Sequence, residues 1–464
     1  MRIDRLTVRN FRKFADRTFE FPCASGSDSG SFHVLIGENG SGKTTVLDAL
    51  AVALGVWLVN PPDSGLGDSR RPISTSEIRL ESVEQGDRVL FREATGGVSV
   101  EAFGWIDGRQ VSWTRRIAEG KKSTSNVAPR RALEIIRECY ERANRNEPVV
   151  LPIIGYYGAG RAWLAFRERK KAQPRSDRMA RRWDAFRGCL NERIRISDLT
   201  EWFETEAIAA VNRSGRFRPG FEIVRLAILH CIPGADAMHY NGDRKEIVLS
   251  INGEAQPFSN LSSGQRMMLA LVADIAIKAV TQNNSLVPPD ELRPEDRPIP
   301  QVLQRTPGVI LIDELDVHLH PKWQRQVVEN LRTLFPQLQF ISTTHSPFIV
   351  QSLRAEELIN LDGQSVPELG NLSVETIAKG LMGIERPDVG QRYEEMVGVA
   401  KSYLQMLDET KRSPAEKLAE YEKQLAAKLA PYADNPAFQA FLEMKHAAKL
   451  GTAPASANGH PEGI

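Results

Sequence analysis

The residues most suited to chemistry form a glycine-rich pattern near the start of the chain. The letters GENGSGKTT match the pattern G-x-x-x-x-G-K-[ST] between a predicted strand and a predicted helix. Its glycines allow backbone N–H groups to curl around phosphate oxygens, and the helix adds its positive end. Lys43 would reach the β- and γ-phosphates, and the Thr44 hydroxyl would bind Mg²⁺. The predicted nucleotide site consists of Gly37, Asn39, Gly40, Ser41, Gly42, Lys43, Thr44 and Thr45.

Two adjacent carboxylates form a second candidate for chemistry. Asp313 and Glu314 follow Val309–Ile312, an apolar run that predicts a short strand buried in a parallel sheet. A carboxylate at such a strand tip can hold Mg²⁺, which gives Asp313 a metal-binding role. Glu314 projects differently and could polarise water for attack on a phosphate. Taken alone, an apolar strand that ends in two acids occurs in many folds.

Two further polar positions lie at predicted element boundaries. A Ser/Gly stretch before the helical run 267–280 could bind an anion at the helix start, although such a stretch, taken alone, is more typical of a plain N-cap. His345 follows a predicted strand at the same sheet edge as Asp313 and could sense a γ-phosphate, although a single histidine is usually structural. The Ser/Gly stretch consists of Ser262, Ser263, Gly264 and Gln265.

The order of the predicted elements favours an α/β fold, with a mixed central sheet flanked by helices, a helical insertion and a helical C-terminal region. Strands are expected within 3–21, 32–36, 60–120, 149–157, 220–250, 309–312 and 339–345. Helices are expected over 46–59, 130–145, 197–210, 267–280, 322–334, 374–382, 391–406 and 414–429. The residues 10–14, NFRKF, are expected to form a turn with an exposed basic pair.

Composition sets limits on the class of protein. The 464 residues carry 60 Lys plus Arg and 59 Asp plus Glu, so the net charge of +1 gives no sign of a nucleic-acid partner. The four cysteines are far apart and match neither a zinc site nor a disulfide framework, which favours a reducing, cytoplasmic compartment. The start of the chain has no signal-peptide pattern, and no apolar run is long enough for a membrane span.

One segment is strongly basic. Trp163–Arg195 carries nine Arg or Lys residues at positions between 167 and 187, with interleaved aromatic residues such as Trp183 and Phe186. This composition is typical of DNA or RNA contact. The aromatic spacing is also helical, in which case the rings belong to the core and the arginines to a solvated face. Arg161, after a predicted strand, could reach a nucleotide or a neighbouring subunit, or be an ordinary surface residue.

Taken together and in this order, the motifs resemble ABC-type ATPases of the RecF, SMC and Rad50 lineage. The resemblance implies that two ATPase heads sandwich ATP, with Ser262 and Gly264 of one head reaching the γ-phosphate bound by the other. It also implies Glu314 as the catalytic acid of the Walker B strand, Asp316 in the D-loop and His345 as the switch histidine. The basic turn is similar to the family's N-terminal basic motif, which implies that Arg12 and Lys13 lie near the nucleotide, with Arg12 as a nucleotide contact. The family's Q-loop glutamine has two candidates here, Gln85 and Gln110.

The run TPGVILIDELDVHLHPKWQ and the run FPQLQFISTTHSPFIV are similar to small bacterial ATPases, including Septu-type, retron-associated anti-phage and OLD-like ATPases. The chain lacks long heptad arms, which disfavours a true SMC or Rad50 protein. It also lacks the D-x-D strand of a Toprim domain after His345. The resemblance therefore implies an ATPase that is not itself a nuclease and has a separate HNH-type or other effector nuclease as partner.

The expected divisions of the chain are an N-terminal ATPase lobe, an insertion lobe with the basic segment, a C-terminal ATPase lobe, a helical partner or oligomer region and a disordered tail. Their predicted bounds are 1–120, 121–250, 251–365, 366–450 and 451–464. Three functions are compatible with them: an ATPase dimer or higher oligomer that regulates a nuclease in anti-phage defence, a RecF-like DNA-repair ATPase, and a nucleotide-gated scaffold that sequesters a toxin.

Overall fold

The computed structural model describes residues 1–23, 30–61, 70–85, 88–125, 129–162, 182–292, 299–363, 372–384, 387 and 390–410. It has two compact units, 1–382 and 383–464. Most of the basic segment (163–181), the predicted helix 414–429 and the predicted tail 451–464 lie outside the described residues. The Arg161 side chain is likewise not described.

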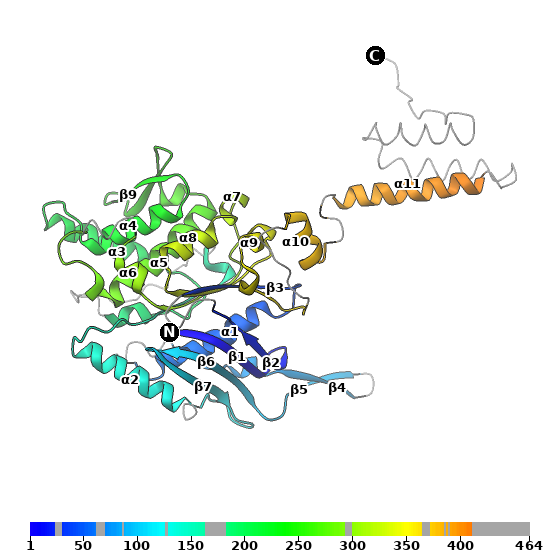
Figure 1. Ribbon diagram of the computed structural model, residues 1–464, viewed down its shortest axis with the longest axis horizontal. Coiled ribbons are helices and arrows are strands. Elements are labelled where there is room, and N and C mark those ends of the chain that lie inside the picture. The colour runs from blue at the N-terminus through cyan, green and yellow to red at the C-terminus, as the bar shows by residue number, and fades with distance from the viewer. Residues whose placement is uncertain are drawn as a thin grey trace, which may run out of the picture. The chain divides into compact units, whose positions relative to one another are not determined.

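A five-stranded parallel sheet forms the centre of the first unit (Figure 1). Its order is β14 (Leu358–Asn360), β3 (Ser31–Ile36), β13 (Leu338–Thr343), β12 (Gly308–Ile312) and β8 (Ile153–Tyr157). Every pair in it is parallel, and β12 is buried along its whole length. The apolar run 309–312, predicted to be a buried strand, is therefore an interior strand of the sheet. Strand β8, from the predicted insertion lobe, is an edge strand of this sheet.

One face of the sheet is covered by α1 (Lys43–Leu54) and a four-stranded antiparallel sheet. The antiparallel sheet has the order β2 (Phe14–Glu20), β1 (Arg2–Phe11), β6 (Val98–Ile106) and β7 (Arg109–Ile117), and α2 (Arg130–Asn144) packs on β7 and β6. Val309 and Leu311 of β12 belong to the core on this side. Because strand side chains alternate, Ile310 and Ile312 belong to the core on the other face.

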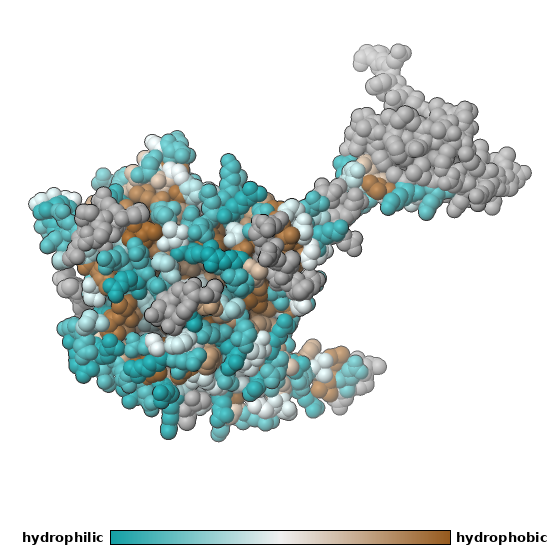
Figure 2. All heavy atoms as spheres, in the orientation of Figure 1, coloured by the Kyte–Doolittle hydropathy of each residue, from teal (hydrophilic) through white to brown (hydrophobic). Residues whose placement is uncertain are grey.

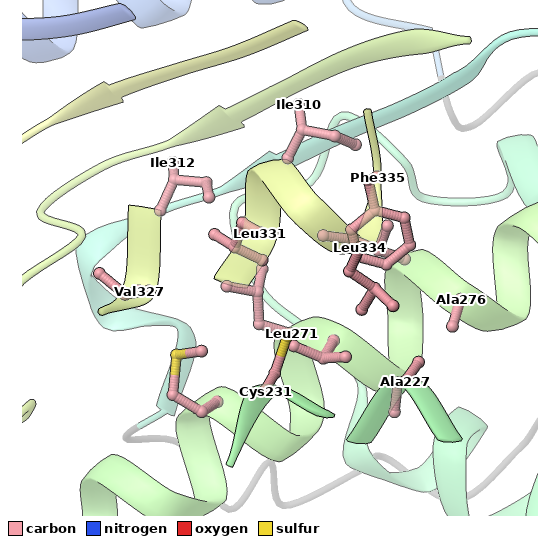
Figure 3. Packing of buried hydrophobic residues seen from close by; sticks show 14 of the residues in the cluster. Ala227, Cys231, Leu271, Ala276, Ile310, Ile312, Val327, Leu331, Leu334 and Phe335 are labelled. Carbon is pink, nitrogen blue, oxygen red and sulfur yellow. The ribbon is translucent and has the colours of Figure 1, made fainter. Parts of the chain in front are cut away.

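The second face is covered by helices. Helices α4 (Pro219–Cys231), α5 (Ser263–Gln282) and α8 (Val327–Leu334) contribute buried side chains to this core. Figure 3 shows Ile310 and Ile312 of β12 near Leu331 and Leu334 of α8, with Leu271 of α5 beyond them. A sheet packed on both faces holds its strand ends in fixed positions, which is what a site built on those ends requires.

Smaller elements complete the described chain. A three-stranded sheet has the order β11 (Glu254–Pro257), β10 (Glu246–Ile251) and β9 (Ala235–Asn241), and a separate hairpin pairs β4 (Leu80–Gln85) with β5 (Arg88–Glu93). The remaining α-helices are α3 (Ile196–Val211), α6 (Gln301–Arg305), α7 (Pro321–Gln324), α9 (Pro347–Gln351), α10 (Val374–Leu381) and α11 (Gln391–Thr410), the last in the second unit. None of the described helices is long and apolar enough to cross a membrane.

The α/β class is confirmed, and the antiparallel strands form sheets of their own beside the parallel one. One element prediction is wrong, because residues 219–231, expected as strand, form α4. Phe221, Val224, Ile228 and Cys231 recur at three- and four-residue spacing and are all buried, which is helical periodicity. Pro219 at the first helical turn starts the helix.

Candidate nucleotide site at the carboxyl edge of the parallel sheet

The phosphate loop lies between β3 and α1, as its sequence predicts. Gly37, Gly40 and Gly42 have φ angles of 152°, 81° and 105°, a region that residues with a side chain rarely adopt. A Cβ on Gly42 would lie 2.5 Å from the Phe14 ring, so this position also needs glycine for packing. The Ser41 hydroxyl is buried in the loop without a hydrogen-bond partner among the described residues. The loop thus has the backbone shape of a phosphate cradle and one buried polar atom left for a ligand.

Lys43 lies folded against its own loop. Its Nζ donates to the carbonyl oxygens of Gly37 at 2.8 Å and Glu38 at 3.0 Å. Burial lowers the pKa of Lys43, and the negative charges of Asp362 and Asp313 oppose this shift. A buried cation whose hydrogen-bond partners in the described part of the chain are carbonyl oxygens is well placed to accept a stronger, negatively charged partner such as a phosphate.

Thr44 and Asp313 meet although they are distant in the sequence. The Thr44 hydroxyl donates to Asp313 Oδ2 at 3.0 Å, and the Thr343 hydroxyl donates to Asp313 Oδ1 at 2.6 Å. Asp313 is the first residue after β12, and its backbone N–H donates to Tyr157 O of β8 at 2.8 Å. A hydroxyl and a carboxylate side by side are the hard oxygen ligands that Mg²⁺ prefers. The residues predicted to hold Mg²⁺ therefore fit that ion.

Glu314 has an unusual backbone. Its φ is 49°, in the left-handed region, and its N–H donates to the Thr343 hydroxyl oxygen at 2.7 Å. Thr343 thus connects the backbone of Glu314 to the carboxylate of Asp313. Non-glycine residues in this conformation cluster at functional sites because the surroundings must hold them there. The backbone of Glu314 is therefore fixed beside the carboxylate of Asp313.

Asp316 organises the next turn of the same edge. Its Oδ1 accepts hydrogen bonds from the Thr344 hydroxyl and from the His345 backbone N–H, the latter at 3.2 Å. Gln324 donates to the carbonyl oxygens of Asp316 and Leu319, at 3.3 and 2.9 Å. His345 is exposed at the end of β13. Asp316 and His345 are therefore direct neighbours at the sheet edge, where the Asp316 carboxylate contacts the backbone N–H of His345.

The two basic residues of the turn between β1 and β2, Arg12 and Lys13, have different partners. Lys13 Nζ contacts the Gly40 carbonyl oxygen of the phosphate loop. Arg12, the predicted nucleotide contact, instead forms ion pairs with Asp48 of α1 at 2.5 Å and with Glu77 at 3.0 Å. Arg71 joins the same two carboxylates at 3.5 and 2.6 Å. Of the two basic residues of this turn, Lys13 therefore contacts the phosphate loop and Arg12 pairs with carboxylates.

The charges in this cluster are strongly coupled. Burial raises the pKa of Asp48, and the two arginines oppose the shift. Burial also opposes ionisation of Glu77, but hydrogen bonds from Arg71 and from the Ser74 N–H outweigh it, so the pKa of Glu77 is lowered. Tyr156 of β8 adds a hydrogen bond to Asp48 at 3.3 Å. The cluster fixes α1, and therefore the phosphate loop, to the turn that carries Lys13.

The Ser/Gly stretch forms the start of α5. The Ser262 hydroxyl accepts from the Gln265 N–H at 3.3 Å, while the Ser262 N–H donates to Gln265 Oε1 at 2.8 Å, a capping box. A Cβ on Gly264 would lie 2.4 Å from His318 O, so the helix start packs closely on the loop after Asp316. Ser262 is exposed, and Ser263 is half-buried. The helix start is thus pre-formed and joined to the acidic loop.

Asp362 was not anticipated from the sequence. It follows β14, and its Oδ2 accepts from the Glu38 N–H of the phosphate loop at 2.9 Å. Only the pairing of β14 with β3 brings Asp362 to the loop. The Q-loop candidates lie elsewhere: Gln85 ends β4 and Gln110 lies on β7, both in antiparallel sheets. Among the described residues, no group of three or more His, Cys, Asp or Glu side chains is arranged to hold a metal ion.

Two families match the chain. Residues 5–208 match the family described as "AAA domain", and residues 241–351 match the family described as "AAA domain, putative AbiEii toxin, Type IV TA system". The first match contains the phosphate loop, and the second contains the α5 start and the Asp313–His345 edge. The two matches together therefore cover the phosphate loop, the α5 start and the Asp313–His345 edge, whereas Asp362 lies outside both.

Known proteins are similar over different lengths. The Retron Vc95 probable ATPase of Vibrio cholerae serotype O1 biovar El Tor is 24% identical over 417 residues, which cover 77% of this chain and 73% of that protein. The Septu protein PtuA of Bacillus thuringiensis is 38% identical over 120 residues, which cover 25% of this chain and 27% of that protein. The aligned part thus spans about a quarter of that Septu protein. The SMC head domain from Thermotoga maritima has a TM-score of 0.41 and 15% identity, covering 78% of this chain and 94% of that chain.

From the phosphate loop, the acidic strand tip and both family matches, we conclude that the chain is a P-loop ATPase with AAA domains, related to the retron-associated ATPases and to Septu PtuA.

Proposed function

We propose that this chain binds and hydrolyses ATP with Mg²⁺ in a head-to-head dimer and regulates a separate effector nuclease in bacterial anti-phage defence. The observation that carries the catalytic part is the Thr44–Asp313 hydrogen bond, because it joins the phosphate loop to the acidic strand tip. Glu314 follows directly, so a metal site and a general base lie on adjacent residues. This pairing is what phosphoryl transfer to water requires.

Each side chain has a defined task in this mechanism. Lys43 exchanges its carbonyl partners for phosphate oxygens, and the loop N–H groups surround the same phosphates. Thr44 and Asp313 hold Mg²⁺, which when bound neutralises phosphate charge and orients the leaving group. Glu314 orients a water molecule and accepts its proton. His345 contacts the γ-phosphate, and Asp316 holds the backbone of that histidine in place.

The dimer rests on the signature residues. Ser262, which is exposed, and Gly264, which is buried, lie at the start of α5 and would bind the γ-phosphate held by a second copy. The first-turn N–H groups of a helix have no partner within that helix, and those outside the capping box could bind an anion, which supports this role. The dimer part is tested with Glu314→Gln, which should retain ATP. At a low concentration at which the nucleotide-free protein is monomeric, we expect the mass of Glu314→Gln to double with Mg-ATP. The double variant Glu314→Gln with Ser262→Arg should keep the mass of a monomer under the same conditions. If mass is unaffected by ATP, the sandwich is wrong.

The partner and the role in defence rest on the relatives, named retron and Septu proteins. The test is purification of the tagged chain expressed from its native operon, in the cytoplasm where we place it. A small nuclease of HNH or another type that co-purifies in fixed stoichiometry, and is lost with Lys43→Ala, supports regulation of an effector. A protein that purifies alone and whose ATPase rate rises with DNA overturns it in favour of DNA repair.

A further inference from the structure

The β4–β5 hairpin exposes apolar side chains on a projection of the first unit. In Figure 1 the two strands extend away from the parallel sheet, and hydrophobic residues gather on this projection in Figure 2. Leu80 and Val89 are each 57% exposed, and Phe91 is 68% exposed. A two-stranded hairpin is at best marginally stable in water by itself. Apolar side chains gathered on such an element mark an interaction surface.

The strand register separates the hairpin into two faces. Leu80 lies opposite Glu93, Ser82 opposite Phe91 and Glu84 opposite Val89. Residues that lie opposite each other share a face. This face, which we call the acidic face, therefore combines three apolar residues with two carboxylates. The other face combines Val83 and Leu90 with pairs that include Arg88 and Arg92.

A second exposed apolar group lies at the end of α3. Ile208 is 61% exposed and Val211, one turn later, is 77% exposed. The exposed Arg213 and Arg216 lie two and five residues after Val211, and Arg216 forms an exposed ion pair with Glu291 at 3.6 Å. Glu204, one turn before Ile208, is paired with Lys245 at 3.3 Å. The α3 end is therefore apolar with a basic border.

The two surfaces are complementary to each other but not to themselves. Across a two-fold axis, the acidic face would bring Glu84 and Glu93 of one copy toward the same acids of another, which is unfavourable. The α3 end instead offers apolar side chains and Arg213. We propose that the acidic face of the hairpin docks on the α3 end of a second copy, a head-to-tail contact that uses other surfaces than the ATP sandwich.

The base of the hairpin is hydrogen-bonded to the turn that contacts the phosphate loop. Arg79 N–H donates to Asn10 O at 2.9 Å, and Arg12 N–H donates to Glu77 O at 2.7 Å. Lys13, in the same turn, contacts Gly40 of the loop. Docking on the hairpin would therefore act on a segment that touches the nucleotide site, and the effect on nucleotide affinity and on assembly must be reciprocal.

The contact is tested by sedimentation of the full chain without nucleotide, so that the ATP sandwich does not contribute. The wild type should associate with rising concentration. Leu80→Ser with Phe91→Ser should abolish this association, and Ile208→Ser with Val211→Ser should do the same. The matched control is Val83→Ser with Leu90→Ser on the opposite face, which should leave association unchanged.

Charge-reversal variants show whether a loss of association comes from the docking contact or from misfolding. Glu93→Arg and Arg213→Glu should each weaken association, and the double variant should recover it because the reversed charges meet again. A chain that stays monomeric at every concentration overturns the proposal. Equal losses for the two hairpin faces, or a double variant no better than either single one, also overturn it.

Discussion

The Thr44 hydroxyl lies 3.0 Å from Asp313 Oδ2, although 269 positions separate the two residues in the chain. Thr44 is fixed by the phosphate loop and Asp313 by the tip of β12. Their contact therefore shows that the phosphate loop and the acidic strand tip lie next to each other. Thr343 completes the arrangement, since it donates to Asp313 Oδ1 and accepts from the Glu314 N–H.

Thr343 is the sharpest test of this arrangement, because it contacts the Mg²⁺ ligand without being one. Thr343→Val keeps the shape but removes the hydroxyl that orients Asp313. We expect Mg²⁺ affinity or activity to fall about 10- to 100-fold, the usual loss for a partner of a metal ligand. Excess Mg²⁺ should restore much of the rate. The control is Ser342→Ala, whose buried hydroxyl has no hydrogen-bond partner among the described residues; an equal loss there would contradict a specific role.

Glu314→Gln tests the general base. The substitution keeps size and polarity but removes proton acceptance, so ATP binding should persist while kcat falls about 10²- to 10⁴-fold. Nucleotide affinity by calorimetry and turnover by phosphate release measure the two effects separately. Normal turnover would remove Glu314 from its role. A silent variant with ATP retained unhydrolysed would favour a nucleotide-gated scaffold.

The sequence predicts those parts of the site whose residues are positioned by their neighbours in the chain. The phosphate loop and Asp313 need only a strand before or after them and a short polar run, so their positions follow from neighbours in the chain. Asp362 reaches Glu38 only because β14 pairs with β3, and sheet order is not written in any short pattern. Thr343 is likewise a contact across strands, although the polar residues that end β13 were a signal for it.

The α4 region and Arg12 were less predictable for physical reasons. Residues 219–231 contain β-branched and aromatic residues that favour strands, yet their helical spacing buries one face on α5, and packing outweighs propensity. Arg12 and Lys13 are adjacent and chemically alike in the sequence. Only the buried position of Asp48 and Glu77 decides which of them forms ion pairs and which one contacts the loop.

Arg12 and Lys13 should therefore differ when substituted. Arg12→Met leaves Asp48 and Glu77 with one fewer cation, and we expect a loss of about 1–3 kcal/mol of folding stability, below the value for a fully buried pair because the Arg12 side chain is 37% exposed. Lys13→Met should leave stability nearly unchanged and weaken nucleotide binding. Urea denaturation and ATP titration of both variants measure this. Reversed effects would return the nucleotide contact to Arg12.

His33 gives the structure a pH dependence that is independent of catalysis. It is fully buried on β3, and neither ring nitrogen has a hydrogen-bond partner among the described residues. Burial lowers the pKa of His33 from 6.5 to about 4, the positive charge of Arg2 adds to the shift, and Asp4 opposes it. The folded chain therefore holds a neutral imidazole.

Because the unfolded chain binds this proton near pH 6.5 and the folded chain only near pH 4, stability should be complete above pH 6.5 and fall as the pH drops toward 4. The total loss is about 3 kcal/mol. His33→Leu should flatten that part of the profile, measured by urea denaturation across the range. His239→Leu, an exposed position on β9, should keep the wild-type slope. An unchanged slope in His33→Leu would show that another group binds the proton.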